Sequence, residues 1–446
     1  MNTPICDFVL DYQISNPVRM HMPGHKGKKL IGPESDDLTE IEGADVLYRS
    51  RGIIRESEEN AARLFRAART VYSTEGSSLC IRAMLYLALL TAREKGIPAR
   101  LLAGRNAHRT LMTAAALLDV EIDWLMPEKD LLSCAVTGEQ LDRALEGKPY
   151  MAVFLTSPDY LGRCTDLRAA AEACRRHGVP LLVDNAHGAY LKFLPEDVHP
   201  LTLGADACCD SAHKTLSCLT GAAYLHLSGK APKGWAEQAE QAMSLFASTS
   251  PSWLILQSLD RMNEELAGGR WHVDLEWTIE AVRRVKEDLR KRGWKLTGDE
   301  PMKLTLNAAQ RGYTGQELHR ILWKAGIECE FADREYLVLM PSPETSGEEW
   351  ERLLIALRAI PQREPLKENP PALPVPQRVL SIREAMLSPQ ETLPVGEAVG
   401  RVLADACVSC PPAVPVMIAG ERITKEAAAC MLYYGVENCL AVKQSL

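Results

Sequence analysis

Residues 181–188 read LLVDNAHG, and residues 210–216, further along the chain, read DSAHKTL. The first stretch is an apolar run ending in Asp184, which predicts a buried parallel strand with a carboxylate at its carboxyl end. The small-residue run 207–210 predicts a neighbouring short strand that delivers Lys214 soon after it ends. Ligands of parallel sheets bind beyond the carboxyl ends of the strands, so we expect the aspartate and the lysine to share one edge of the sheet.

A lysine and a buried aspartate placed in this way are what a pyridoxal phosphate (PLP) site requires. The amine of Lys214 would bind the cofactor aldehyde, and the carboxylate of Asp184 would keep the pyridine nitrogen protonated so that the ring accepts electrons. Each residue alone has an ordinary interpretation, because most lysines are solvated and many strands end in an aspartate. The order of the parts favours a PLP site, and a phosphate-binding α/β enzyme of another kind is the alternative.

The size and charge of the chain narrow the class of protein. A length of 446 residues allows two or three domains, and 46% hydrophobic with 25% charged residues is ordinary for a globular protein. The net charge of −8 and the absence of a basic tract indicate no nucleic acid or anionic membrane as partner. We expect no signal peptide and no membrane span, and the thirteen scattered cysteines favour the reducing cytoplasm.

One group of cysteines has the spacing of metal ligands. Cys407 and Cys410 are three residues apart, and Cys430 and Cys439 follow at wide spacing. A structural zinc site normally uses a second close pair, which this segment lacks. We therefore expect buried thiols here and no metal site in the chain.

Strand-like and helix-like segments alternate through the first 250 residues, which predicts an α/β fold with right-handed crossovers and a mostly parallel seven-stranded sheet. Beyond it we expect one long helix from residue 251 past Arg290, and then smaller α+β C-terminal domains. The predicted strands are 71–74, 101–103, 122–125, 151–155, 180–183, 207–210 and 221–227. The predicted domains are an irregular N-terminal arm (1–55), a PLP-binding large domain (56–250), a small α+β domain (251–360), a proline-rich linker (361–376) and a C-terminal module (377–446).

Several short motifs, taken in order, resemble the Orn/Lys/Arg decarboxylase family of fold-type I PLP enzymes, in its short bacterial form without the N-terminal wing domain. The resemblance covers nearly the whole chain and implies decarboxylation of a basic L-amino acid (arginine, lysine or ornithine) to the amine and CO2, as in polyamine biosynthesis. The motifs that carry it are PGHKG (23–27), GSS (76–78), RNAHR (105–109), SPDYLG (157–162), VDNAHG (183–188), SAHKTL (211–216) and STSPS (248–252), with Gly420 and Glu421 in the C-terminal module.

The resemblance assigns catalytic roles to Lys214, Asp184, His187 and His108, with His108 stacked on the cofactor ring. Gly76, Ser77 and Ser78 follow a predicted strand and open a helix, where backbone N–H groups and hydroxyls suit a phosphate, although serine is also a common helix cap. The resemblance adds further residues around the cofactor and implies active sites at the interface of a homodimer or higher even oligomer. These added residues are Ser211, His213 and, reaching the partner's phosphate, Ser248 and Thr249.

The cofactor-facing positions match the family pattern, whereas some substrate-facing positions depart from it. Glu330, Asp333 and Glu421 resemble acidic positions that meet the distal cation of a basic amino acid, and solvated surface carboxylates are an equal alternative. The family usually has glutamate and histidine where this chain has Asn185 and Tyr190. An aminotransferase, an aldolase-type lyase, or a PLP-binding protein with little catalytic activity therefore stays open as an alternative.

Overall fold

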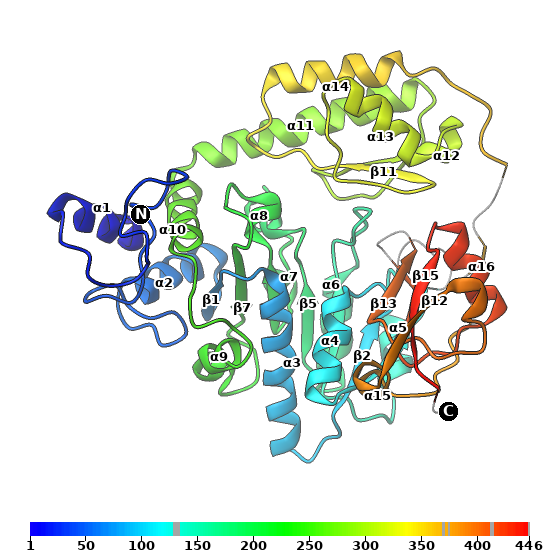
Figure 1. Cartoon of the computed structure of the whole chain (residues 1–446), viewed down its shortest axis with the longest axis horizontal. Coiled ribbons are helices and arrows are strands. Elements are labelled where there is room, and N and C mark those ends of the chain that lie inside the picture. Colours follow the sequence, from blue (N-terminus) through cyan, green and yellow to red (C-terminus); the bar gives the residue numbers. More distant parts are fainter. Residues whose placement is uncertain (128–133, 368–370, 373–374, 411–413, 445–446) are drawn as a thin grey trace. The chain divides into compact units, whose positions relative to one another are not determined.

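The computed structural model describes residues 1–127, 134–367, 371–372, 375–410 and 414–444, without the side chains of 409 and 410. It divides into two compact units, each built from several stretches of the chain (Figure 1). The first unit contains residues 1–99, 138–157 and 167–273, and the second contains the remaining described residues. The predicted domain boundaries stay predictions, and residues 368–370 and 373–374 of the predicted linker lie outside the described residues.

Seven strands form one mostly parallel sheet, which confirms the predicted fold class. Their order is β1-β7-β6-β5-β4-β2-β3, and β7 runs antiparallel to both of its neighbours. The strands are β1 (Arg69–Ser73), β2 (Arg100–Gly104), β3 (Glu121–Leu125), β4 (Ala152–Thr156), β5 (Leu181–Asp184), β6 (Ala207–Asp210) and β7 (Ala223–Leu227).

The central strands are apolar because helices cover them. Every residue of β5 and β6 is buried, as expected of a strand with both faces packed. Helix α3 (Ser77–Glu94) runs along the strands in Figure 1 and packs against β5, β6 and β7, while α6 (Leu167–Arg176) packs against β5. Further helices of the first unit are α2 (Ile53–Phe65), α5 (Gly138–Leu145), η1 (Ala189–Phe193), α7 (Pro200–Leu203), α8 (Ala212–Thr215) and α9 (Trp235–Ser244).

The N-terminal segment is more ordered than the sequence predicted. Residues expected to be irregular include α1 (Pro4–Ser15), which packs against α2 and α10 (Trp253–Gly268). Asp260 of α10 accepts hydrogen bonds from the backbone N–H groups of Ile5 and Cys6, at 2.9 and 3.0 Å. A carboxylate thereby satisfies donors in the first turn of α1, where the helix dipole also favours negative charge.

The long helix predicted after residue 251 is two helices. Helix α10 ends at Gly269, whose φ of 82° is left-handed, and α11 (Arg270–Lys291) begins directly after it. A left-handed glycine is a common helix stop because it has no Cβ to clash. The amphipathic pattern continues through this break, so the pattern alone predicted a single helix.

The second unit contains a four-stranded antiparallel sheet, in the order β10-β11-β9-β8, packed against helices. Its core includes Val282 and Leu289 of α11, Leu318 of the helix α13, and Trp350 and Leu357 of the helix α14. The elements are β8 (Leu296–Thr297), β9 (Leu304–Asn307), α12 (Ala308–Arg311), α13 (Gly315–Lys324), β10 (Phe331–Ala332), β11 (Tyr336–Leu339) and α14 (Gly347–Ala359).

The C-terminal module of the second unit has two short antiparallel ladders, β12 with β15 and β13 with β14. Arg383 of this module donates a 2.7 Å hydrogen bond to the carbonyl of Ala116 near the end of α4 (Arg109–Leu118). The elements are α15 (Ile382–Leu387), β12 (Gln390–Pro394), η2 (Val395–Glu397), β13 (Cys407–Cys410), β14 (Val414–Ile418), α16 (Lys425–Tyr433) and β15 (Asn438–Val442). Cys430 is buried, and the side chain of Cys410 lies outside the described part of the chain.

Within the described residues, no helix combines the length and the apolar character needed to cross a membrane.

Two glycines in matched positions test the packing of the second unit. Each glycine is the first residue of a helix, and each directly follows an N-cap residue that forms a capping box. Gly315 follows Thr314, and Gly347 follows Ser346. A Cβ on Gly315 would lie 2.0 Å from the carbonyl oxygen of Tyr336, whereas a Cβ on Gly347 would meet nothing within 4 Å. We predict that Gly315→Ala lowers the free energy of unfolding by about 1–3 kcal/mol or more. Gly347→Ala should leave it unchanged or raise it by up to about 1 kcal/mol.

Chemical denaturation of both variants measures this difference. Equal stability of the two variants would contradict the close packing of Gly315 against β11.

Candidate functional site

Asp184 is the last residue of β5, and its carboxylate is buried at the strand end. The side chain is 3% exposed, and Oδ1 accepts a 3.2 Å hydrogen bond from the backbone N–H of Ala186. The thiol of Cys209, its partner across the parallel β5–β6 pair, lies 3.6 Å from the same oxygen. The carboxylate is therefore held at the strand end by the turn that follows it and by the neighbouring strand.

Lys214 and His187 come together from two different turns. His187 follows β5, and Lys214 lies in the short helix α8, which follows β6. The Nζ atom of Lys214 lies 2.9 Å from Nε2 of His187, and His187 is only 6% exposed. The structure thus brings together at one sheet edge three residues that the sequence predicted, an amine, an imidazole and a carboxylate.

A second group of predicted residues gathers at the start of α3. Gly76 precedes the helix with a φ of 72°, and its N–H donates to the carbonyl of Gly221 at 2.8 Å. The hydroxyl of Ser211 donates to that of Ser77 at 2.9 Å, so the turn after β6 reaches the start of α3. Ser78 is the second residue of α3. The N-terminus of a helix together with nearby hydroxyls forms a favourable place for a phosphate.

Three predicted residues of the first unit remain, and their contacts or exposure are as follows. His213 directs Nδ1 to the carbonyl of Ala222 at 2.9 Å. Ser248 and Thr249 are exposed, and the N–H of Ser248 donates to a carboxylate oxygen of Glu75 at 2.8 Å. Sequence reasoning did not assign Glu75 a role, although it directly precedes the predicted phosphate residues.

In the second unit, His108 is the N-cap of α4. Its Nδ1 accepts a 3.3 Å hydrogen bond from the N–H of Thr110 and lies 2.9 Å from the hydroxyl of the same residue. The ring is exposed, so the cap holds a flat ring at a helix start without burying it.

Glu421 is engaged by an arginine to which the sequence analysis gave no role. Arg105, which follows β2, binds it in a bidentate pair with distances of 2.7 and 2.9 Å. Arg105 is 1% exposed and Glu421 is 5% exposed. Glu421 also accepts a hydrogen bond from the N–H of Ile418. Both oxygens of Glu421 are therefore occupied, which favours a structural role over contact with a substrate cation.

The other two predicted substrate carboxylates differ from each other. Glu330 is exposed and accepts a 2.6 Å hydrogen bond from the hydroxyl of Tyr160. Asp333 is buried, and burial raises its pKa to about 6 even though Oδ1 accepts hydrogen bonds from the N–H groups of Glu335 and Tyr336. Its Oδ2 has no hydrogen-bond partner among the described residues.

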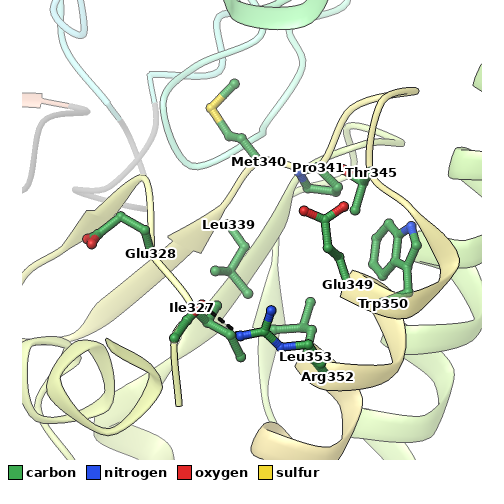
Figure 2. Close-up of a pocket in the computed structure, with 11 residues that line it drawn as sticks. Ile327, Glu328, Leu339, Met340, Pro341, Thr345, Glu349, Trp350, Arg352 and Leu353 are labelled. Atoms are coloured by element: carbon green, nitrogen blue, oxygen red, sulfur yellow. Dashed lines mark hydrogen bonds between the residues drawn. The ribbon is translucent and has the colours of Figure 1, made fainter. Parts of the chain in front are cut away.

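A cavity of about 230 Å3 lies between β11 and α14 (Figure 2). Some of the residues that line it are close in sequence to these two carboxylates. Glu328, Glu349 and Arg352 line it together with apolar side chains, and Arg352 donates a 3.3 Å hydrogen bond to the carbonyl of Gly326. None of the predicted site residues lines this cavity.

A lysine, a histidine and an aspartate at the strand ends of a mostly parallel sheet are typical of fold-type I enzymes, and solved structures share this fold. The constitutive lysine decarboxylase of E. coli matches with a TM-score of 0.79, over 99% of this chain and 82% of that chain, at 18% identity. A serine palmitoyltransferase of Sphingomonas wittichii matches with a TM-score of 0.55, over 70% of this chain and 77% of that one, at 15% identity.

The family follows from two further matches. The family model described as the major domain of the Orn/Lys/Arg decarboxylases matches residues 3–305, and the one described as their C-terminal domain matches residues 372–440. The chain belongs to the Orn/Lys/Arg decarboxylase family, which confirms the resemblance stated from the motifs.

Two of the relatives of nearly the same length are named arginine decarboxylase. The arginine decarboxylase of Bacillus subtilis is 29% identical over 95% of this chain and 92% of its own. The arginine decarboxylase of Halalkalibacterium halodurans is 29% identical over 96% of this chain and 92% of its own.

The buried Arg105–Glu421 pair leads to a prediction that separates a structural role from a substrate role. Glu421→Gln leaves a buried guanidinium without its countercharge, so we predict a loss of about 3–5 kcal/mol in the free energy of unfolding. The matched control is Glu330→Gln, which changes an exposed carboxylate and should stay within about 0.5 kcal/mol of the parent. Chemical denaturation measures both. A Glu421→Gln variant with parental stability and a raised KM would instead assign Glu421 to the substrate.

Proposed function

We propose that the chain is a PLP-dependent decarboxylase that converts a basic L-amino acid to the corresponding amine and CO2. The observation that carries this proposal is the 2.9 Å contact between Lys214 and His187 beside the buried carboxylate of Asp184. Membership of the Orn/Lys/Arg decarboxylase family supports the reaction, and the fold supports the cofactor.

The residues present fit PLP. Lys214 supplies an amine for the cofactor aldehyde, and Asp184 supplies a carboxylate for the pyridine nitrogen. The start of α3, with Gly76, Ser77 and Ser78, and the hydroxyl of Ser211 would hold the phosphate. When bound, PLP supplies an electron sink for the pair of electrons left behind by CO2. The stacking role of His108 and the place of His213 beside the phosphate stay predictions.

Three side chains of the protein would then hold or transfer protons during the reaction. Asp184 would keep a proton on the pyridine nitrogen of bound PLP, because a buried carboxylate stabilises a neighbouring positive charge strongly. Lys214 and His187 are close enough to exchange a proton between Nζ and Nε2. Either residue can therefore return a proton to Cα after CO2 has left.

We propose arginine as the first substrate to test, because several similar relatives are named arginine decarboxylase. Of the three predicted substrate carboxylates, Asp333 is the strongest remaining candidate for the distal cation. One of its oxygens has no partner among the described residues, whereas both oxygens of Glu421 are occupied by Arg105. Lysine and ornithine stay alternatives.

We also propose that the enzyme works as a homodimer in the cytoplasm. Ser248 and Thr249 are exposed in the single chain, as residues completing a partner's phosphate site would be. The described cysteines are free thiols, which suits a reducing compartment.

A panel of amino acids with parallel detection of CO2, amines and keto acids tests the proposed reaction. We predict CO2 release in a 1:1 ratio with an amine from arginine, lysine or ornithine, and no CO2 from leucine or glutamate. The release should depend on added PLP. A keto acid as product would show an aminotransferase. PLP binding without turnover of any amino acid in the panel would point to a binding protein.

A further inference from the structure

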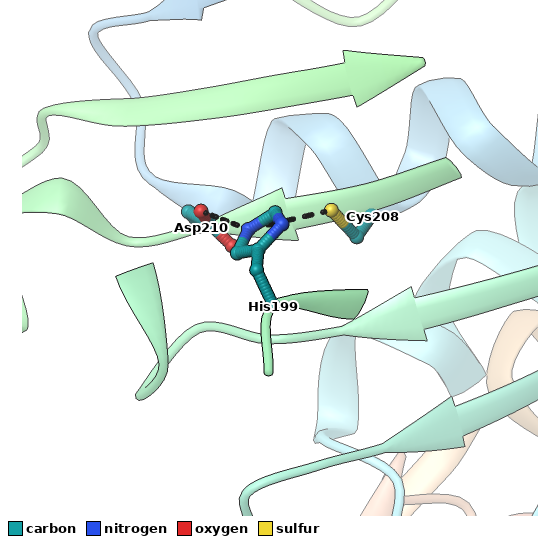
Figure 3. A group of neighbouring side chains, drawn as sticks. All are labelled: His199, Cys208 and Asp210. Atoms are coloured by element: carbon teal, nitrogen blue, oxygen red, sulfur yellow. Dashed lines mark hydrogen bonds and ion pairs between the residues drawn. The ribbon is translucent and has the colours of Figure 1, made fainter. Parts of the chain in front are cut away.

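Asp210, the last residue of β6, is a fully buried carboxylate that the proposed reaction does not use. Its Oδ2 lies 2.9 Å from Nε2 of His199 and 3.4 Å from Nε2 of His226. Its Oδ1 accepts a 2.7 Å hydrogen bond from the side-chain amide of Asn185. All four side chains are 0% exposed, and Figure 3 shows the imidazole of His199 next to the carboxylate.

The two histidines keep this carboxylate charged. Burial by itself raises the pKa of Asp210, but His199 and His226 outweigh burial and hold the pKa well below its usual range. The hydroxyl of Thr70 lies 2.8 Å from Nδ1 of His226, which fixes the orientation of that ring. Asp210 is therefore a strong hydrogen-bond acceptor inside the core, and charge-assisted hydrogen bonds are stronger than neutral ones.

Asn185 connects this carboxylate to the turn between Asp184 and His187. The N–H of Asn185 donates to the carbonyl of Cys209 at 3.0 Å, and its carbonyl accepts from the N–H of Gly188 at 2.7 Å. A Cβ on Gly188 would lie 2.1 Å from Oδ1 of Asn185, so the amide is packed tightly under the turn. The main chain of Asn185 is thus held by two backbone hydrogen bonds, and its side-chain amide is held by Asp210.

The same cluster could be considered as a metal site, because ligand atoms of His199, Cys208 and Asp210 lie within 4.8 Å of one another (Figure 3). The Sγ atom of Cys208 lies 3.9 Å from Nε2 of His199, and that nitrogen already faces Oδ2 of Asp210 at 2.9 Å. Both oxygens of Asp210 already face hydrogen-bonding partners. The geometry therefore favours a proton-linked network over a metal.

We propose that Asp210, backed by His199, is a positioning residue that holds the Asp184–His187 turn in place through the amide of Asn185. This inference rests on the proposed function, since that turn carries both the carboxylate for the pyridine nitrogen and the imidazole beside Lys214. It also explains why an amide stands at position 185. A second carboxylate there would face the charged Asp210, and two like charges in contact cannot both stay ionised in a core.

An exchange of the two side chains tests this pairing. Asn185→Asp places two carboxylates against each other, whereas the double variant Asn185→Asp with Asp210→Asn restores one amide and one carboxylate of the same shapes. The readouts are the PLP dissociation constant from titration of the apoprotein, the visible circular dichroism of bound PLP, and kcat and KM with the best substrate of the panel.

We predict that Asn185→Asp weakens PLP binding and lowers kcat by about 10- to 100-fold, the range expected for a lost charge-assisted hydrogen bond, with a smaller change in KM. The circular dichroism band of bound PLP should also change. The double variant should recover most of the loss in all three readouts.

The control is Glu58→Gln. Glu58 also lies in the first unit, is as fully buried as Asp210, and pairs with Arg69 at 2.6 Å. This variant should lower the unfolding temperature while leaving the circular dichroism band and the PLP affinity unchanged. This control separates a general loss of stability from a specific effect on the turn.

Three results would overturn the positioning role. They are parental PLP binding and turnover by Asn185→Asp, a double variant no better than the worse single variant, or one equivalent of tightly bound metal in the purified protein. If the parent protein binds no PLP, the proposed function fails and the positioning role fails with it. If the parent binds PLP and the exchange shows no recovery, only the positioning role fails.

Discussion

The parallel pairing of β5 with β6 is the constraint on which the candidate site depends. Asp184 ends β5 and pairs in register with Cys209, so the turns that follow both strands leave the sheet at the same edge. One turn carries His187 and the other carries Lys214, and their side chains meet at 2.9 Å. A shift of this register by one residue would turn Asp184 to the other face of the sheet and away from the segment that carries Lys214.

Several buried polar side chains lie at that edge of the sheet. Buried polar groups are stable only when they are hydrogen-bonded or paired with an opposite charge. Asp184 is held by backbone and thiol donors, and Asp210 by two imidazoles and an amide. The second unit shows the same rule in the Arg105–Glu421 pair, which joins the end of β2 to the C-terminal module. Asp184, Asp210 and Arg105 lie at or just beyond strand ends, where side chains from other parts of the sequence can satisfy them.

The sequence predicted the sheet well because its strands are short apolar runs between helices, and β5 and β6 fall within one residue of the expected ranges. It also predicted which residues share the site edge, since parallel strands place their ends together. It missed α1, whose first turn depends on Asp260 more than 250 residues away. It missed the break at Gly269, where the amphipathic pattern continues. It also gave no role to Arg105, because no local pattern reveals a partner 316 residues further along the chain.

The central claim is that Lys214 is the residue that binds the cofactor. Incubation of the purified protein with PLP, reduction with borohydride and peptide mapping by mass spectrometry test this claim directly. We predict one pyridoxyl group per chain, on Lys214, and none on a Lys214→Ala variant. A label on another lysine such as Lys26, or an unchanged amount of label on the Lys214→Ala variant, would contradict it.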